Sequence, residues 1–236
     1  MLKLLKTIFP ILCTALILTS CMSDDDDNSA IIDESTMCDI VTFIGNLESN
    51  NNRSVFQFQK EGDSRLTTLR AKNTQLNTSE YKIGSRLLLY YIAESGTHNI
   101  DDNITVTNTY YVFNDSIRTG DITKLPDWDY NPIYVNAIWR SGSFINIQCG
   151  LTFSYEPSAF MLMVDSTTID NPMPDVYLSY KRGSDRESYF KNFYASIDIA
   201  NLWNKSTCKG FTLHVNDSNL GNNKIEFKKT TLTPMQ

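Results

Sequence analysis

The sequence predicts an all-β protein in which a small barrel is followed by a β-sandwich, behind a targeting segment and an acidic tether. Three observations lead to this fold class. The chain contains 12 Tyr and 12 Phe together with many Thr, Ile and Val residues, which favour strands. Short segments that alternate apolar and polar residues recur along it, separated by turns rich in Asn, Gly and Ser. No apolar face with helical spacing extends beyond about two turns, except near Ile197 to Trp203.

Residues 1–20 have the order of features expected of a bacterial signal peptide. Two lysines precede an apolar run from Ile8 to Leu18, which is shorter than the about 20 residues that span a bilayer. Leu18-Thr19-Ser20-Cys21 then matches a lipobox, in which a diacylglycerol is attached to the cysteine thiol before cleavage. We therefore expect a lipid anchor on Cys21. The alternative is an ordinary secretory signal beside a chance cysteine.

Residues 21–36 form the acidic tether, which buries no apolar surface and should behave as a solvated linker. Met22 follows the lipidated cysteine in place of the aspartate that would retain the protein in the inner membrane. A serine followed by acidic residues resembles the surface-export signal of Bacteroidetes lipoproteins, and the residues concerned are Ser23, Asp24, Asp25, Asp26 and Asp27. We expect an outer-membrane protein facing the cell surface, with a linker in a periplasm-facing lipoprotein as the alternative.

Size and charge limit the classes of partner. Cleavage leaves 216 of the 236 residues, which suffices for one large β domain or two small ones. Loss of Lys3 and Lys6 leaves 19 basic against 27 acidic side chains, a net charge of about −8. Because no basic stripe is present, we expect no nucleic-acid partner, and membrane contact only through the lipid.

Cys13 would be removed with the signal peptide and Cys21 would carry the lipid, so three cysteines remain. Cys38, Cys149 and Cys208 allow at most one disulfide, and their spacing is too wide for a zinc knuckle. Free cysteine behaves as a small apolar residue, so we expect all three to be buried in the core.

The first half, residues 37–123, predicts five strands, which suits a small Greek-key barrel of the OB type. The expected strands are 39–44, 53–59, 65–71, 86–92 and 104–113. The second half, residues 124–236, begins with a seam over 124–132 and predicts about seven short strands, as in a β-sandwich. These are 133–139, 144–153, 160–164, 176–180, 193–199, 211–215 and 224–228.

Two segments, together with the lipobox and tether, resemble those of the NigD-like lipoproteins of Bacteroidetes. They are Tyr81-Lys82-Ile83-Gly84-Ser85-Arg86 in the first half and the hairpin Trp139-Arg140-Ser141-Gly142-Ser143-Phe144-Ile145-Asn146-Ile147 in the second. The resemblance covers nearly the whole mature chain. It implies an OB-like domain followed by a β-sandwich, and a suggested immunity role against a bacteriocin-like antibacterial activity. It brings no catalytic residues and transfers only architecture: Gly84 and Gly142 as turn positions and Trp139 as an anchor of the sandwich core.

The residues needed for acid–base or covalent catalysis are scarce. Histidine is the commonest general base, yet the chain has only His98, expected in a loop, and His214, expected at a surface or half-buried strand position. No GxSxG motif is present, and carboxylate pairs such as Asp127 with Asp129 lack a recognisable context. We therefore expect no catalytic residue, no metal site and no cofactor.

Aromatic residues offer the remaining opening for function. Trp128, Tyr130 and Tyr134 lie in or next to the seam between the two halves, although packing within the sandwich or the seam would use the same residues. Domain interfaces are preferred sites for pockets, so we place the contact surface at these three residues. The sequence thus predicts a noncatalytic cell-envelope lipoprotein that binds an unknown macromolecular partner, in an immunity-like role. The alternatives are a glycan-binding accessory lipoprotein of an outer-membrane uptake system and, last, an unrecognised enzyme.

Overall fold

The computed structural model describes residues 35–60, 65–96, 101–124, 131–154, 159–182, 188–219, 221 and 223–229. Residues 34–236 form one compact unit by their contacts. Several residues singled out in the sequence lie outside the described ranges: Cys21, Ser23, Asp24, Asp25, Asp26, Asp27, His98, Trp128 and Tyr130. The signal peptide, the lipid anchor and the tether therefore stay predictions from the sequence.

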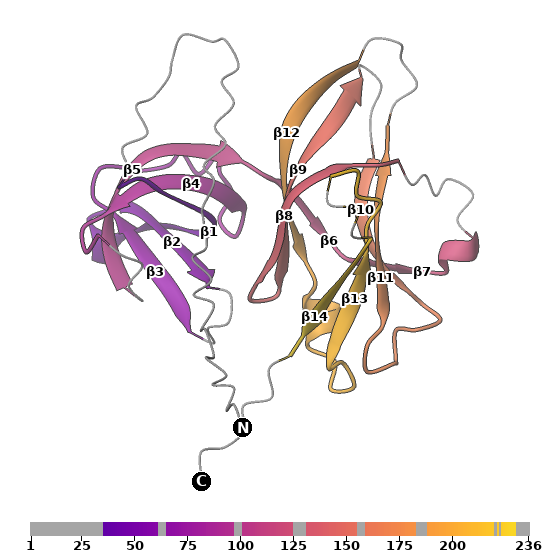
Figure 1. Cartoon of the computed structure of the whole chain (residues 1–236). Coiled ribbons are helices and arrows are strands. Elements are labelled where there is room, and N and C mark those ends of the chain that lie inside the picture. The colour runs from indigo at the N-terminus through magenta and orange to yellow at the C-terminus, as the bar shows by residue number, and fades with distance from the viewer. Residues whose placement is uncertain are drawn as a thin grey trace, which may run out of the picture. The chain divides into compact units, whose positions relative to one another are not determined.

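The first region is a closed five-stranded barrel in the order β1-β2-β3-β5-β4, drawn in indigo to magenta in Figure 1. Its strands are β1 (Met37–Leu47), β2 (Arg53–Gln59), β3 (Leu66–Ala71), β4 (Arg86–Ala93) and β5 (Asp101–Tyr111), with a 3-10 turn, η1 (Glu48–Asn50), after β1. The β3–β5 pair is parallel and the other pairs are antiparallel. Its five strands match the five that the sequence predicts.

The barrel has a core of its own because each strand alternates between an inward and an outward face. Inward side chains from all five strands, among them Val41, Phe56, Leu69, Leu87 and Ile104, are almost completely buried. The outward face of β2 and β3 is more polar, with Gln57 and Thr68 half-buried.

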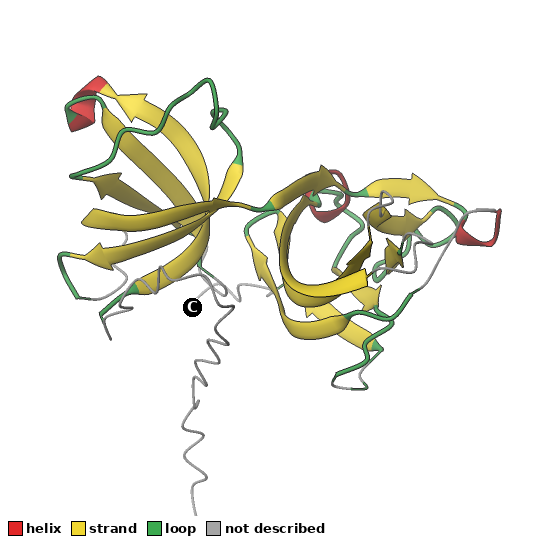
Figure 2. Cartoon of the chain, turned by 90° about the horizontal axis from the view of Figure 1, so that it is seen from above, coloured by secondary structure: helices red, strands yellow, loops and turns green. Residues whose placement is uncertain are grey.

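The second region is a β-sandwich of a five-stranded sheet, β14-β13-β11-β10-β7, and a four-stranded sheet, β6-β12-β9-β8. Figure 2 shows strands as the main secondary structure of this region, with only short helical turns. The elements in chain order are β6 (Phe113–Ser116), β7 (Arg118–Gly120), η2 (Ile122–Lys124), β8 (Tyr134–Ser141), β9 (Phe144–Ser154), β10 (Ala159–Asp165), β11 (Asp175–Lys181), β12 (Ser188–Asp198), α1 (Ala200–Trp203), β13 (Gly210–His214) and β14 (Lys224–Lys228). The all-β fold class is confirmed.

The strand pairing shows that the sandwich begins before residue 124, the boundary expected from the sequence. β6 pairs in parallel with β12, and β7 pairs in parallel with β10, so both belong to the sandwich sheets. The barrel strands end at Tyr111. In the sequence, residues 104–113 alternate as one strand, and only the identity of the distant partner strands reveals the break.

Trp139 does not anchor the sandwich core, contrary to the expectation from the sequence. A β-bulge between Val135 and Ala137 shifts the register of β8 against β9. A bulge inserts one residue, so the side chains beyond it change face. Val135 lies in the sandwich core, whereas Trp139 packs against a separate cluster of Ile40, Leu88 and Val112.

The expectation of three buried cysteines is wrong for Cys38. Cys149 and Cys208 are buried and Cys38 is exposed, and none of these three described cysteines forms a disulfide. Cys38 lies near the start of β1, ahead of Ile40 and Val41, where burial in that strand begins.

Candidate functional site

The two segments that carry the family resemblance meet where the barrel contacts the sandwich. Arg86 opens β4 of the barrel, and Asn146 lies in β9 of the sandwich, 60 residues further along the chain. Nη2 of Arg86 donates a hydrogen bond to Oδ1 of Asn146 at 3.3 Å. We call this contact region, with Arg86 at its centre, the junction.

Arg86 is only 2% exposed and ties strands of both regions together. On the barrel side, Nη1 donates to Oγ1 of Thr42 at 3.0 Å and Nη2 donates to the carbonyl oxygen of Ile40 at 2.9 Å. On the sandwich side, Nε donates to Oγ of Ser196 at 3.0 Å, and the guanidinium carbon lies 4.4 Å from the centre of the Phe144 ring. One side chain thus links β1 and β4 to β9 and β12.

The junction holds a buried positive charge with neutral hydrogen-bond acceptors. Burial lowers the pKa of Arg86 to about 10, and the nearby charge of Asp39 opposes this fall. The group is therefore still cationic at neutral pH. Within the ranges that the structure describes, no carboxylate forms an ion pair with Arg86, and Nδ2 of Asn146 is buried without an acceptor. The cluster has more donors than acceptors.

Apolar packing seals the junction beside the polar cluster. Ile40, Leu88 and Val112 are buried there, with three half-buried aromatic side chains, Tyr90, Trp139 and Tyr194, packed against them. The aromatic rings come from both regions, since Tyr90 belongs to the barrel and the other two to the sandwich. Trp139 thus helps to fix one region against the other.

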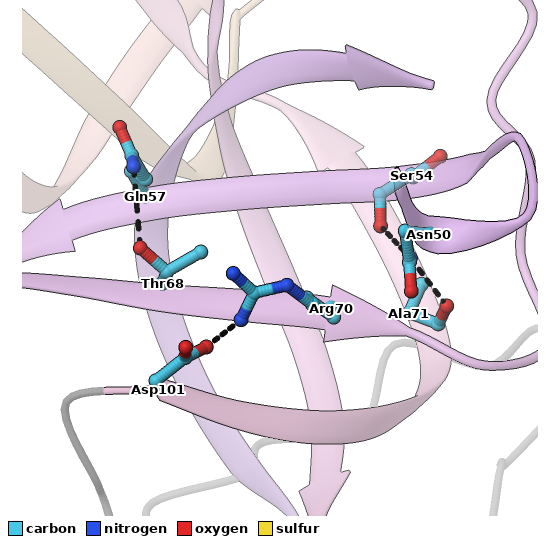
Figure 3. Close-up of polar contacts among 7 residues, drawn as sticks. All are labelled: Asn50, Ser54, Gln57, Thr68, Arg70, Ala71 and Asp101. Atoms are coloured by element: carbon cyan, nitrogen blue, oxygen red, sulfur yellow. Dashed lines mark hydrogen bonds and ion pairs between the residues drawn. The ribbon is translucent and has the colours of Figure 1, made fainter. Parts of the chain in front are cut away.

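A pocket of about 170 Å³, which we call the Arg86 pocket, opens between the barrel and the β8–β9 hairpin. Its barrel wall includes Gln57, Gln59 and Leu66 from β2 and β3, and its other wall is the hairpin 141–144. Oγ of Ser141 donates to the carbonyl oxygen of Gln59 at 2.7 Å, which holds the two walls together. The β2–β3 pair carries the Gln57–Thr68 hydrogen bond of Figure 3, and the Arg70–Asp101 ion pair in the same figure joins β3 to β5.

Gly142 shapes this pocket as well as the hairpin turn. Its φ of 61° is left-handed, as the turn prediction requires, and a Cβ there would lie 2.9 Å from Oε1 of Gln59. Gly84 also has a left-handed φ of 88°, in a turn with open space around it.

Of the predicted contact residues, only Tyr134 is described, and it does not line the Arg86 pocket. It opens β8 opposite Gly150 and is 42% exposed. Phe190 of β12 lies over that glycine, with its ring edge-on to Tyr134 at 6.3 Å between centroids. Tyr134 and Phe190 therefore form an exposed aromatic pair on the four-stranded sheet.

His214, expected to be surface or half-buried, is half-buried beside a second pocket. Its Nε2 lies 2.6 Å from Oδ1 of Asp175, and its ring stacks on Tyr177 at 4.4 Å. The pocket has a volume of about 430 Å³ and is also lined by Ile122, Thr123, Asn216, Asn223 and Lys224. No serine or cysteine is among these lining residues, so the Asp–His pair has no nucleophile of those types beside it.

The described ranges contain no group of three or more His, Cys, Asp or Glu side chains placed to hold a metal ion. Over the same residues, no helix is long and apolar enough to cross a membrane.

Solved structures from Bacteroidetes share the arrangement of both regions. A protein of unknown function from Bacteroides vulgatus is 15% identical, with a TM-score of 0.64, over 84% of this chain and 92% of that one. A NigD-like immunity protein from Bacteroides caccae is 13% identical, with a TM-score of 0.52, over 81% of this chain and 91% of that one. This chain has their fold. A candidate lipoprotein from Bacteroides fragilis matches at 12% identity and a TM-score of 0.52, over 82% and 96% of the two chains.

The fold that the family resemblance implied is thus confirmed. Identities this low bear on the fold alone. Neither family models nor curated protein sequences match this chain.

Sequence reasoning quoted Arg86 and Asn146 but assigned them no role. Each is a polar residue within a strongly apolar run, Arg86 before Leu87-Leu88-Leu89 and Asn146 between Ile145 and Ile147. A buried polar side chain needs a partner, so this pattern is the available signal for a polar contact. It does not say that the two residues are partners of each other.

Proposed function

We propose that this chain is a noncatalytic cell-envelope lipoprotein that binds a macromolecular partner at the cell surface, in the manner of an immunity protein. The lipid on Cys21 holds it to the outer membrane, and the acidic tether presents the folded part outward. The partner is an antibacterial protein of the bacteriocin type, which the bound lipoprotein neutralises.

The observation that carries the proposal is the fold shared with a NigD-like immunity protein across both regions. A pocket between two rigid β regions supports a binding role, since domain interfaces are favoured places for ligands and rigid scaffolds commonly present binding loops.

The proposal is tested in a strain of the native host from which the gene has been deleted. The strain is exposed to antibacterial proteins secreted by related strains and is complemented with the wild type or with Cys21→Ala. We expect the secreted proteins to kill the deletion strain. Complementation with the wild type should restore survival, and complementation with Cys21→Ala should not. Equal survival of all strains under every secreted antibacterial protein would remove the immunity role.

Surface exposure has its own test. Protease added to intact cells should remove the wild-type protein, whereas a variant with alanine at positions 24–27 should be sheltered. If both are protected equally, the anchor faces the periplasm.

A glycan-binding role is the second candidate, and the exposed Tyr134–Phe190 pair supports it because sugar rings stack on aromatic faces. Tyr134→Ala and Phe190→Ala should then each weaken binding of outer-membrane polysaccharide fragments. Survival in the killing assay should be unchanged by either variant.

A further inference from the structure

We propose that the Arg86 pocket binds a carboxylate carried by an acidic side chain of a protein partner. The inference deepens the proposed binding function, on which it rests, by naming the chemical group that the site accepts.

A row of hydrogen-bonding side chains leads across the barrel to Arg86. Thr42 of β1 is paired in register with Gln57 of β2 and with Arg86 of β4, and Gln57 is paired with Thr68 of β3. Neighbouring strands lie about 4.8 Å apart, so these side chains stand side by side on one outer face. Nε2 of Gln57 donates to Oγ1 of Thr68 at 3.2 Å, as Figure 3 shows.

The guanidinium of Arg86 has capacity left for a ligand. It donates four hydrogen bonds to described residues, one fewer than the five N–H groups of arginine allow. The remaining N–H belongs to Nη1, the nitrogen that also donates a hydrogen bond to Thr42. Both Arg86 and Thr42 line the pocket. Phe144 covers one face of the guanidinium, and a hydrogen bond to the remaining N–H is made in the guanidinium plane.

Charge favours an anion at this point. A buried cation is costly unless it is paired, and the acceptors of Arg86 in the described residues are all neutral: Ser196, Asn146, Thr42 and the Ile40 carbonyl. Asp39 lies near enough to act on Arg86 but forms no ion pair with it, so a bound carboxylate would supply a direct pair, and it matches the planar geometry of guanidinium. The chain is acidic overall, so its net charge does not attract an acidic partner from a distance. The attraction to Arg86 acts only within the screening distance of about 8 Å.

Size favours a side chain over an extended small molecule. The pocket has a volume of about 170 Å³, below the about 300 Å³ at which drug-sized sites begin. Ser143 and Gln57 on its opposite walls can hydrogen-bond the second carboxylate oxygen or the neighbouring amide of the partner. A single acidic side chain held on a larger protein meets these requirements.

The test uses the mature protein, residues 21–236, purified in a non-ionic detergent. N-acetylglutamate and its neutral counterpart N-acetylglutamine, both with the α-carboxyl group capped as a methylamide so that only the side chain can carry a charge, are titrated at constant ionic strength. The melting temperature and the heat of binding are the readouts. A ligand that binds only the folded state raises the melting temperature. We expect saturable binding of N-acetylglutamate and none of N-acetylglutamine.

Variants locate the site. Gln57→Glu puts a competing carboxylate into the pocket and should weaken N-acetylglutamate binding at least about tenfold (about 1.4 kcal/mol). Ser143→Asp should do the same from the hairpin wall. Gln148→Glu is the matched control, because Gln148 is a half-buried strand glutamine that hydrogen-bonds Tyr194 and does not line the pocket. It should bind as the wild type does.

Equal responses to the charged and neutral probes, no response to either, or full binding by both pocket variants would overturn the proposal. Glucuronate and methyl glucoside, tested in parallel, distinguish the source of the carboxylate. Binding of glucuronate without N-acetylglutamate would overturn the protein source in favour of an acidic sugar. None of these outcomes affects the killing assay, so failure of the carboxylate site and failure of the immunity role are separable.

Discussion

The barrel and the sandwich reach an all-β fold by different kinds of pairing. In the barrel, three of the strand pairs, β1–β2, β2–β3 and β4–β5, join neighbours in the chain. In the sandwich, β6 and β7 pair in parallel with the distant strands β12 and β10, and β9 pairs with β12 over its full length. The sandwich also has neighbour pairs, β8–β9, β10–β11 and β13–β14, so the difference lies in β6 and β7. Their parallel partners are far away in the sequence, and local alternation alone does not reveal them.

The two regions also differ in what their outer faces do. The barrel directs a polar row towards Arg86, while the four-stranded sheet presents Asn146, Ser196 and Trp139 to the junction. The barrel brings the cation and the sandwich brings most of its side-chain acceptors, so neither region has a complete junction alone. Variants in each region can therefore show whether the two regions fold and act as separate units.

The largest effects should come from cavities in the two cores. Phe211→Ala in the sandwich removes a ring packed between Trp203 and Phe227, and Phe56→Ala in the barrel removes one packed on Phe43. Each should cost about 3–5 kcal/mol of unfolding free energy. Urea denaturation followed by circular dichroism measures this. If the junction couples the regions, both variants shift one shared transition; two separate transitions in the wild type would show independent folding.

Loss of Arg86 should have the second-largest effect, and it should weaken the coupling between the barrel and the sandwich. Arg86→Met leaves Oγ of Ser196 and the Ile40 carbonyl without the donor that Arg86 supplies, while Oδ1 of Asn146 keeps only its bond from Ser196; the loss should cost about 3 kcal/mol. We expect the single urea transition to broaden or split. Ser196→Ala is the control: it keeps the cation and removes one acceptor of Arg86 together with one donor to Oδ1 of Asn146, and it should cost about 1 kcal/mol. A sharp single transition of unchanged midpoint in Arg86→Met would refute a structural role for the junction.

Alanine substitutions at the two turn glycines should distinguish the cost of backbone strain from the cost of steric contact. Gly84→Ala in the barrel meets open space and should cost about 1 kcal/mol, because its left-handed φ disfavours any Cβ. Gly142→Ala has the same strain plus contact with Gln59, so about 2 kcal/mol is expected. Thermal unfolding compares them, and equal losses would mean that Gln59 moves aside freely.

Thiol labelling should distinguish the regions without destabilising either. Cys38 of the barrel is exposed and should react with iodoacetamide in the native protein. Burial raises the pKa of Cys149 to about 12, so it has almost no reactive thiolate at neutral pH, and buried Cys208 is shielded from the reagent. Mass spectrometry should find one fast site before denaturation and both sandwich cysteines modified after it. Rapid native labelling of Cys149 would contradict its burial.

The sequence by itself determined the all-β class, the five barrel strands and seven of the sandwich strands, because the alternation of apolar and polar residues is a local property of each strand. It also singled out the segments that hold Arg86 and Asn146, and predicted the lipid anchor at Cys21. Only the tertiary structure decided that 113–120 leave the barrel, that a bulge turns Trp139 towards the junction, and that Cys38 is exposed. Only the tertiary structure places Arg86, which lines the pocket, within hydrogen-bond distance of Asn146 and Ser196. The reason is physical: register and partner choice arise from contacts between residues far apart in the chain, and a shift of one residue exchanges the buried and exposed faces of a strand.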